Sequence, residues 1–411
     1  MTCDAFKCAQ TSQVQEFLVK RDMKLTGQQA CFLAVISLTF FSVFTYFFSK
    51  SPTNLQRPRV VNIVTTLRGF QEAEPEQLSV QVAESKLQLA ESKPSNISLV
   101  TSRPLEKKCN VSTEPVLSIV PWQRVTYPGK LWKGLQLPMI TIGSSGRLGN
   151  LMGNYASIFG LGRAYNTTVR IDVALQKQLA KIFPRITIPS IDTNASMAEL
   201  QSLPYLGNYV YGDKEAAAAG LLGAHAFLAK GYPIEIQLFH AYGCEIRNEF
   251  TFAPDIQEKV RQFWLAKKNL ITDTVLVGFH IRRKDYLKYV KHRGEQMPNQ
   301  TYYSNAMKFY KDKFSKVVFV VGSDDTKYIK GEFKGRPDVI FVPGKSPEED
   351  MAILASCNHS IITVGTFGFW TAYLAGGLVV YPGDFYIPNY PLQKDRYERA
   401  GMDLFVPIPR T

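Results

Sequence analysis

Two adjacent arginines follow an apolar run and have the chemistry of a phosphate-binding site. The uncharged run Val275–Phe279 leads directly into His280, Ile281, Arg282 and Arg283. Guanidinium groups are permanently charged forks that match phosphate oxygens, and ligands of open α/β sheets bind at the carboxyl ends of strands. The pattern therefore predicts an anion site at this strand end, with a nucleotide diphosphate as the best-suited anion. The alternative is an ordinary solvated basic turn.

A second group of small and hydroxyl-bearing residues stands between an apolar run and a helical segment. Small residues let a ligand approach the backbone, and hydroxyls can bond to phosphate or sugar oxygens near a helix N-terminus. We expect this turn to bind the same ligand as the arginines. Its members are Thr363, Gly365, Thr366, Phe367 and Gly368. The aromatic residues that follow have helical spacing and are predicted to pack in the core; they are Phe369, Trp370 and Tyr373.

A glycine-rich loop separates the strand candidate Met139–Ile142 from a helical segment with an apolar face. Gly143, Gly146 and Gly149 allow a tight turn whose amides approach a ligand. Their spacing is not that of dinucleotide-binding folds. The loop is therefore either part of a binding site or a plain connection between strand and helix.

The chain has no Asp-x-Asp motif, with which many nucleotide-sugar enzymes hold a divalent metal. The nearest acidic pair is Asp324 and Asp325, for which a helix N-cap is the favoured interpretation. Without such a motif, arginines have to neutralise the leaving diphosphate. The sequence therefore predicts a site without metal, in which Arg282 and Arg283 carry the positive charge.

The remaining pattern predicts an α/β protein. At 411 residues the chain exceeds the roughly 100–150 residues of one domain, so we expect two domains and flanking segments. Ser346 and Pro347 are typical of a helix start, and Gly376 of the end of a helix over Thr366–Ala375. Apolar runs alternate with helical segments, which indicates a parallel, doubly wound sheet. These runs are Val275–Ile281, Val317–Val321, Val339–Val342, Ser360–Val364 and Leu378–Tyr381.

The uncharged segment Ala30–Phe48 is long enough to cross a bilayer, since about 20 residues span its roughly 30 Å core. We interpret it as an uncleaved signal anchor; a cleaved signal peptide is the alternative. Flanking Lys and Arg residues are balanced and do not orient it. The glycosylation acceptors do orient it, because all of them follow the segment; this indicates that the bulk of the chain is lumenal or extracellular. They are Asn96, Asn110, Asn166, Asn194, Asn299 and Asn358.

The charge and the cysteines restrict the class of protein further. The net charge of +13 suits anionic partners, but the basic residues are dispersed along the chain. We therefore expect no nucleic-acid or heparin partner. Cys109, Cys244 and Cys357 follow the anchor and allow at most one disulfide, and no Cys-x-x-Cys spacing supports a zinc site.

Taken together, these segments resemble the galactoside α-1,2-fucosyltransferase family of blood-group H and secretor type (glycosyltransferase family 11). The resemblance rests on Gly146–Asn150, Val277–Tyr286, Cys357–Trp370 and Ala372–Gly377, which come in the family's order. It implies GDP-β-L-fucose as donor, a terminal β-galactoside on a glycoprotein or glycolipid as acceptor, inversion to an α-fucoside, and no metal or other cofactor. It also implies a single-pass type II protein of the Golgi membrane.

The resemblance further implies a GT-B arrangement, in which two Rossmann-like doubly wound domains face a cleft. The expected organisation is a cytoplasmic tail over 1–29, the transmembrane anchor over 30–48, and a largely irregular stem over 49–135. An acceptor-side domain over 136–268 and a donor domain over 269–411 follow. The sequence leaves open whether the stem mediates a homodimer.

In the implied mechanism, Arg282 contacts the donor phosphates, Arg283 is a second contact, and Asn150 lies across the cleft near the fucose or the acceptor. An acceptor hydroxyl attacks the anomeric carbon in line. Asp285 either deprotonates that hydroxyl or only orients the arginines. Two other interpretations remain: a fucosyltransferase that forms another linkage, and an inactive homologue that binds a glycan or a nucleotide.

Overall fold

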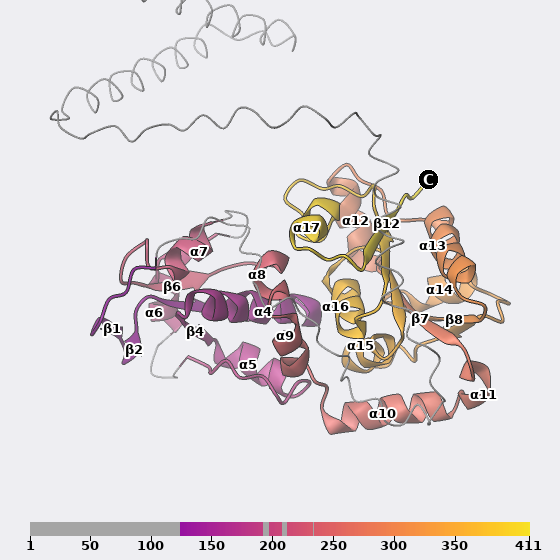
Figure 1. The fold of residues 1–411 in the computed structure, drawn as a ribbon, viewed down its shortest axis with the longest axis horizontal. Helices are drawn as coiled ribbons and strands as arrows, with labels where there is room; N and C mark the ends of the chain where they lie inside the picture. The colour runs from indigo at the N-terminus through magenta and orange to yellow at the C-terminus, as the bar shows by residue number, and fades with distance from the viewer. Residues whose placement is uncertain (1–123, 192–196, 208–211, 233) are drawn as a thin grey trace, which may run out of the picture. The chain divides into compact units, whose positions relative to one another are not determined.

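The computed structural model describes residues 124–191, 197–207, 212–232 and 234–411, which all belong to the compact unit Pro94–Thr411 (Figure 1). The predicted tail, anchor and most of the stem lie outside these residues, as do Asn96, Asn110 and Asn194. Among the described helices, none is long and apolar enough to cross a membrane.

The C-terminal part of the chain forms a six-stranded parallel sheet in the order β12-β11-β10-β7-β8-β9. The strand order reverses between β7 and β10. The five apolar runs predicted as strands are confirmed, and β12 adds a sixth strand at one edge. The strands are β7 Val275–Ile281, β8 Val317–Ser323, β9 Val339–Phe341, β10 His359–Ile362, β11 Val379–Pro382 and β12 Phe405–Ile408.

Helices cover both faces of this sheet. In β8, Phe319 and Val321 pack in one apolar cluster with residues of α13, whereas Val318 and Val320 pack in another with residues of α10 and α15. A strand covered on both faces has to be apolar at every position, which explains why these runs predict strands. The helices of this part are α12 Lys284–His292, α13 Gln300–Lys313, α14 Thr326–Glu332, α15 Pro347–Ala355, α16 Thr366–Ala375 and α17 Lys394–Arg399.

Two helices begin and end at the predicted signals. The Ser346 hydroxyl caps α15 by accepting a hydrogen bond from the Glu349 N–H at 3.2 Å, and Pro347 is the first helical residue. Helix α16 ends at Gly376, whose φ of 67° lies in the left-handed region that glycine adopts without strain. Both helix predictions are confirmed.

The N-terminal part forms a four-stranded parallel sheet in the order β4-β3-β6-β5, which reverses between β3 and β6. The predicted strand Met139–Ile142 is confirmed as β3. The other strands are β4 Thr168–Ile171, β5 Tyr205–Leu206 and β6 Ala226–Ala229. An antiparallel hairpin, β1 Leu131–Trp132 and β2 Leu135–Gln136, precedes them and packs against Met139. The hairpin begins in the predicted stem, residues 49–135, and ends just beyond it. An α/β fold with parallel sheets is therefore confirmed.

Helix α4, Leu148–Tyr165, connects the two parts of the core. It follows β3, lies on β3 and β4, and also contacts α8 and α16. A helix surrounded in this way is apolar on most sides, so 13 of its 18 residues are buried. Helix α10 leads from α9 towards α11 and the second sheet (Figure 1). The remaining helices are α5 Val173–Ala180, α6 Met197–Ser202, α7 Asp213–Ala218, α8 Ile236–His240, α9 Gly243–Glu249, α10 Pro254–Leu265 and α11 Lys268–Ile271.

Candidate functional site

Arg282 lies directly after β7, beside the end of β10, where the strand order of the six-stranded sheet reverses. Its backbone N–H donates a hydrogen bond to Oγ1 of Thr363 at 2.9 Å. Ligands of doubly wound sheets bind at such reversal points, outside the carboxyl ends of the strands. The structure therefore brings the predicted arginine pair and the predicted turn together.

The side chain of Arg282 is held from three sides. Its Nη1 donates to Oδ2 of Asp324 at 2.6 Å, its Nη2 donates to Asp285, and its guanidinium carbon lies 4.9 Å from the centre of the Tyr286 ring. Only 10% of the side chain is exposed. Two carboxylates and an aromatic ring thus fix the orientation of this fork, and Asp285 takes part in orienting it.

Arg283 is fixed by the neighbouring acidic pair. Its backbone N–H donates to Oδ1 of Asp324 at 2.9 Å, and its guanidinium carbon lies 3.5 Å from the centre of the Tyr328 ring. Asp325 accepts from the Tyr328 N–H at 3.1 Å, which confirms the predicted N-cap. Asp324 has a different role, because it binds both arginines. The sequence pattern gave no sign of this role of Asp324.

The turn before α16 depends on a glycine and on a buried tyrosine. Gly365 has a φ of 93°, and a Cβ there would lie 3.4 Å from the Tyr286 ring and 3.6 Å from Cγ of Arg282. The Gly365 N–H donates to the hydroxyl of Tyr390 at 2.8 Å. Burial and the nearby Tyr286 raise the pKa of Tyr390 well above its ordinary value, so this hydroxyl stays neutral. Tyr390 therefore holds the turn against Arg282.

We expect Tyr390→Phe to lower the free energy of unfolding by about 1–3 kcal/mol, because it leaves the buried Gly365 N–H without its acceptor. Urea denaturation followed by circular dichroism measures the effect. Tyr386→Phe is the matched control, since Tyr386 is 61% exposed and its change should be neutral. Equal stability of both variants would show that the hydroxyl of Tyr390 does not hold the turn.

His280 lies behind the turn. Its ring centre is 4.7 Å from that of Phe367, and a Cβ on Gly368 would lie 3.0 Å from its Nδ1. Burial, with a smaller contribution from the charge of Arg282, lowers the pKa of His280 to about 3. The imidazole is therefore neutral at physiological pH and packs against the turn. Phe369, Trp370 and Tyr373 are buried, which confirms their predicted place in the core.

Contacts between distant segments bring the glycine-rich loop to the same site. The Thr366 hydroxyl donates to Oδ1 of Asn150 at 2.8 Å. A Cβ on Gly149 would lie 2.7 Å from the Phe367 backbone nitrogen. The backbones at the N-termini of α4 and α16 are therefore in direct contact, with no side chain between them. Arg147, which sequence reasoning did not select, forms an ion pair with Asp285. The loop therefore contacts both the turn before α16 and Asp285, as a loop that belongs to the predicted site would.

The described residues contain no group of three or more His, Cys, Asp or Glu side chains that could hold a metal ion. Of the described acceptor asparagines, Asn166 and Asn299 are exposed, and the Asn299 side chain caps α13. Asn358 accepts from the Leu276 N–H at 3.0 Å. Cys244 is disulfide-bonded, and Cys357 is a buried thiol.

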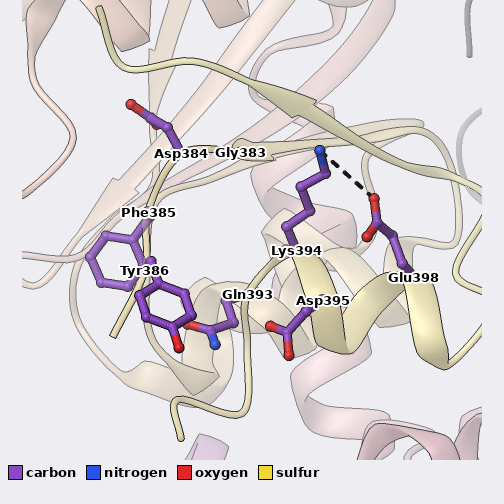
Figure 2. A pocket seen from close by; sticks show the side chains of 8 residues that line it. All are labelled: Gly383, Asp384, Phe385, Tyr386, Gln393, Lys394, Asp395 and Glu398. Carbon is purple, nitrogen blue, oxygen red and sulfur yellow. Dashed lines mark ion pairs between the residues drawn. The ribbon is translucent and has the colours of Figure 1, made fainter. Parts of the chain in front are cut away.

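A shallow pocket lies elsewhere, around the start of α17 (Figure 2). Tyr386 and Phe385 stand on one side of it, and Lys394 pairs with Glu398 across 3.9 Å on the other. None of the residues predicted for the site lines it. The lining residues are Gly383, Asp384, Phe385, Tyr386, Gln393, Lys394, Asp395 and Glu398.

Open α/β sheets bind ligands, nucleotides among them, at the point where the strand order reverses, and the arginine pair and the turn before α16 lie at such a point. The model of glycosyl transferase family 11 matches residues 108–401, and the chain belongs to this family. Rat galactoside alpha-(1,2)-fucosyltransferase 2 is 32% identical over 278 residues, or 66% of this chain and 77% of the relative. Mouse galactoside 2-alpha-L-fucosyltransferase Sec1 is 34% identical over 259 residues, which are 62% of this chain and 69% of the relative.

Solved structures with a similar course of the chain include two fucosyltransferases. POFUT1 in complex with GDP-fucose matches with a TM-score of 0.40 and 11% identity, over 57% of this chain and 93% of its own. NodZ alpha-1,6-fucosyltransferase soaked with GDP-fucose matches with a TM-score of 0.38 and 14% identity, over 57% of this chain and 92% of its own. The family assignment rests on the sequence matches, not on these structures.

Proposed function

We propose that the chain transfers L-fucose from GDP-β-L-fucose to the 2-hydroxyl of a terminal β-galactoside, with inversion and without metal. The fixed arginine pair at the β7–β10 reversal is the observation that carries this proposal. The family assignment and the names of the relatives support the choice of donor, acceptor and linkage.

In the proposed reaction, Arg282 and Arg283 hold the diphosphate of the donor. As the bond between the anomeric carbon and the phosphate oxygen breaks, negative charge grows on GDP, and preoriented guanidinium groups stabilise that charge. Asp324 holds the guanidinium of Arg282, and Asp325 pairs with the guanidinium of Arg283 at 3.4 Å. Little reorganisation is therefore needed when the charge develops. His280 supports the site from behind through Phe367, while Thr363, Gly365, Thr366 and Gly368 shape the turn beside the donor.

The acceptor hydroxyl attacks the anomeric carbon from the face opposite to GDP, which inverts the configuration. Its oxygen forms the new bond, its proton passes to a base, and the electron pair of the broken bond leaves with GDP. Asp285 is either that base or an orienting residue, and its pairs with Arg282 and Arg147 favour orientation. The hydrogen bond from Thr366 fixes the Asn150 side chain beside the turn. From there, Asn150 would position the reacting sugars from the side of the N-terminal sheet.

We further propose that residues 136–268 and 269–411 are the acceptor-side and donor domains of a GT-B arrangement and face a cleft. The two parallel sheets and the pairing of Arg147 with Asp285 support this organisation. A Golgi-membrane, type II location with the catalytic part in the lumen rests on the apolar segment 30–48 and on the acceptor asparagines that follow it.

Transfer should persist unchanged in excess EDTA. The charge of the leaving group is assigned to Arg282 and Arg283, and Asp324 and Asp325 already bind these arginines or cap α14. Initial rates of GDP release with and without EDTA measure this. Loss of activity in EDTA that added Mn²⁺ restores would contradict metal-free transfer.

The decisive experiment incubates the purified full-length chain with GDP-fucose and a panel of β-galactosides, followed by NMR of the product. The expected product carries α-fucose on the 2-hydroxyl of galactose. Fucose on another hydroxyl would reassign the linkage. No transfer despite GDP binding would favour an inactive nucleotide-binding homologue.

A further inference from the structure

Tyr232 is an exposed aromatic residue on the loop after β6. Tyr232 is one of the large hydrophobic residues that remain exposed to solvent, and 41% of its surface is accessible. The order of the four-stranded sheet reverses between β3 and β6, so the loops that follow these two strands lie next to each other. Tyr232 therefore stands at a position where α/β sheets bind ligands.

The ring of Tyr232 packs on the glycine-rich loop. A Cβ on Gly146 would lie 2.7 Å from Cε1 of Tyr232 and 2.8 Å from Cβ of Asn150. Gly146 also has a φ of 84°, which other residues rarely adopt. Because Gly146 has no side chain, the Tyr232 ring and the Asn150 side chain can both pack against its backbone.

Asn150 connects this point to the donor side, because its Oδ1 accepts the hydrogen bond from Thr366. The exposed ring, the amide and the turn that borders the arginines therefore form one continuous surface. An aromatic face beside a few fixed polar groups is the usual composition of a site for a small polar ligand. A pyranose fits it, since its C–H face packs on an aromatic ring and its hydroxyls bond to amides.

We infer that Tyr232 is the platform on which the galactose ring of the acceptor stacks. The inference rests on the proposed function and adds an acceptor-binding residue to it. Stacking on Tyr232 places the sugar next to Asn150, and so next to the turn that carries Thr366. The tyrosine therefore contributes to acceptor binding and leaves donor binding to the residues around Arg282.

The test compares Tyr232→Ala, Tyr232→Phe and Tyr386→Ala in the full-length chain, with lactose as acceptor. Tyr232→Ala should raise the KM for lactose roughly tenfold and leave the KM for GDP-fucose unchanged, since one aromatic stacking contact is lost. Tyr232→Phe keeps the ring and should stay within about twofold of the parent. Tyr386→Ala should have no effect, because this tyrosine is also exposed but lines the separate pocket of Figure 2.

Slow hydrolysis of GDP-fucose without acceptor, together with the melting temperature, shows whether Tyr232→Ala is folded and binds donor. An unchanged lactose KM in Tyr232→Ala overturns the inference, as does a raised KM in Tyr386→Ala alone. A parent protein that transfers no fucose to any β-galactoside refutes the proposed function instead. The two failures are therefore distinguishable.

Discussion

Arg282→Lys should lower kcat/KM for fucosyl transfer by about 10²–10³-fold, the usual loss when one preoriented donor to a developing charge is removed. Lysine keeps the positive charge next to Asp324 and Asp285, so the fold should stay intact. It loses the planar fork that donates to two partners at once. Steady-state rates with GDP-fucose, and calorimetric titration with GDP, measure the two consequences.

Arg261→Lys is the matched control, since Arg261 forms an exposed pair with Glu258 on α10 and should tolerate the change. Melting curves of both variants should coincide with that of the parent. If Arg282→Lys transfers fucose at the parental rate, the guanidinium fork is not needed for departure of the diphosphate, and the proposed mechanism fails.

Gly149→Ala should reduce transfer by at least about 100-fold, because it separates the two helix N-termini that build the site. The added methyl group would lie 2.7 Å from the Phe367 nitrogen and 2.8 Å from the Thr366 carbonyl carbon. Both atoms are backbone and cannot rotate away. We also expect a loss of about 1–3 kcal/mol in unfolding free energy from overpacking.

Gly331→Ala is the control for this substitution. Gly331 lies within α14, and apart from its chain neighbours and the backbone of its own helix, nothing lies within 4 Å of the position that its Cβ would take. Alanine should therefore be neutral there, or stabilise the helix by about 0.5–1 kcal/mol. Parental activity of Gly149→Ala would mean that the helix N-termini can separate without harm to the reaction.

Five of the six strands of the second sheet could be predicted because their signals are local, whereas β12 was missed. The run Val317–Val321 is apolar at every position since both of its faces are covered, and β8 contains all of it. Helix α16 has the predicted bounds because Gly376 stops it. The arginine pair was found for the same reason, since a buried run followed by charges is visible within ten residues.

The contacts that shape the site are not local, and sequence alone did not show them. Asp324 lies 42 positions from Arg282, and an acidic pair before a helix gives the same pattern whether or not it binds an arginine. Asn150 and Thr366 are 216 positions apart. Tyr232 shows no pattern of its own, because its position matters only once β6 lies beside β3.

The pairing of both arginines with aspartates affects how strongly the chain binds polyanions. The net charge of +13 attracts any polyanion over long distances. At the site, however, Asp285, Asp324 and Asp325 act as tethered counterions. An incoming sulfate or phosphate has to compete with them for each guanidinium group, so diffuse chains such as heparin gain little there. We expect compact diphosphates that engage both forks together to keep their advantage, which would make the proposed donor site selective despite the basic surroundings.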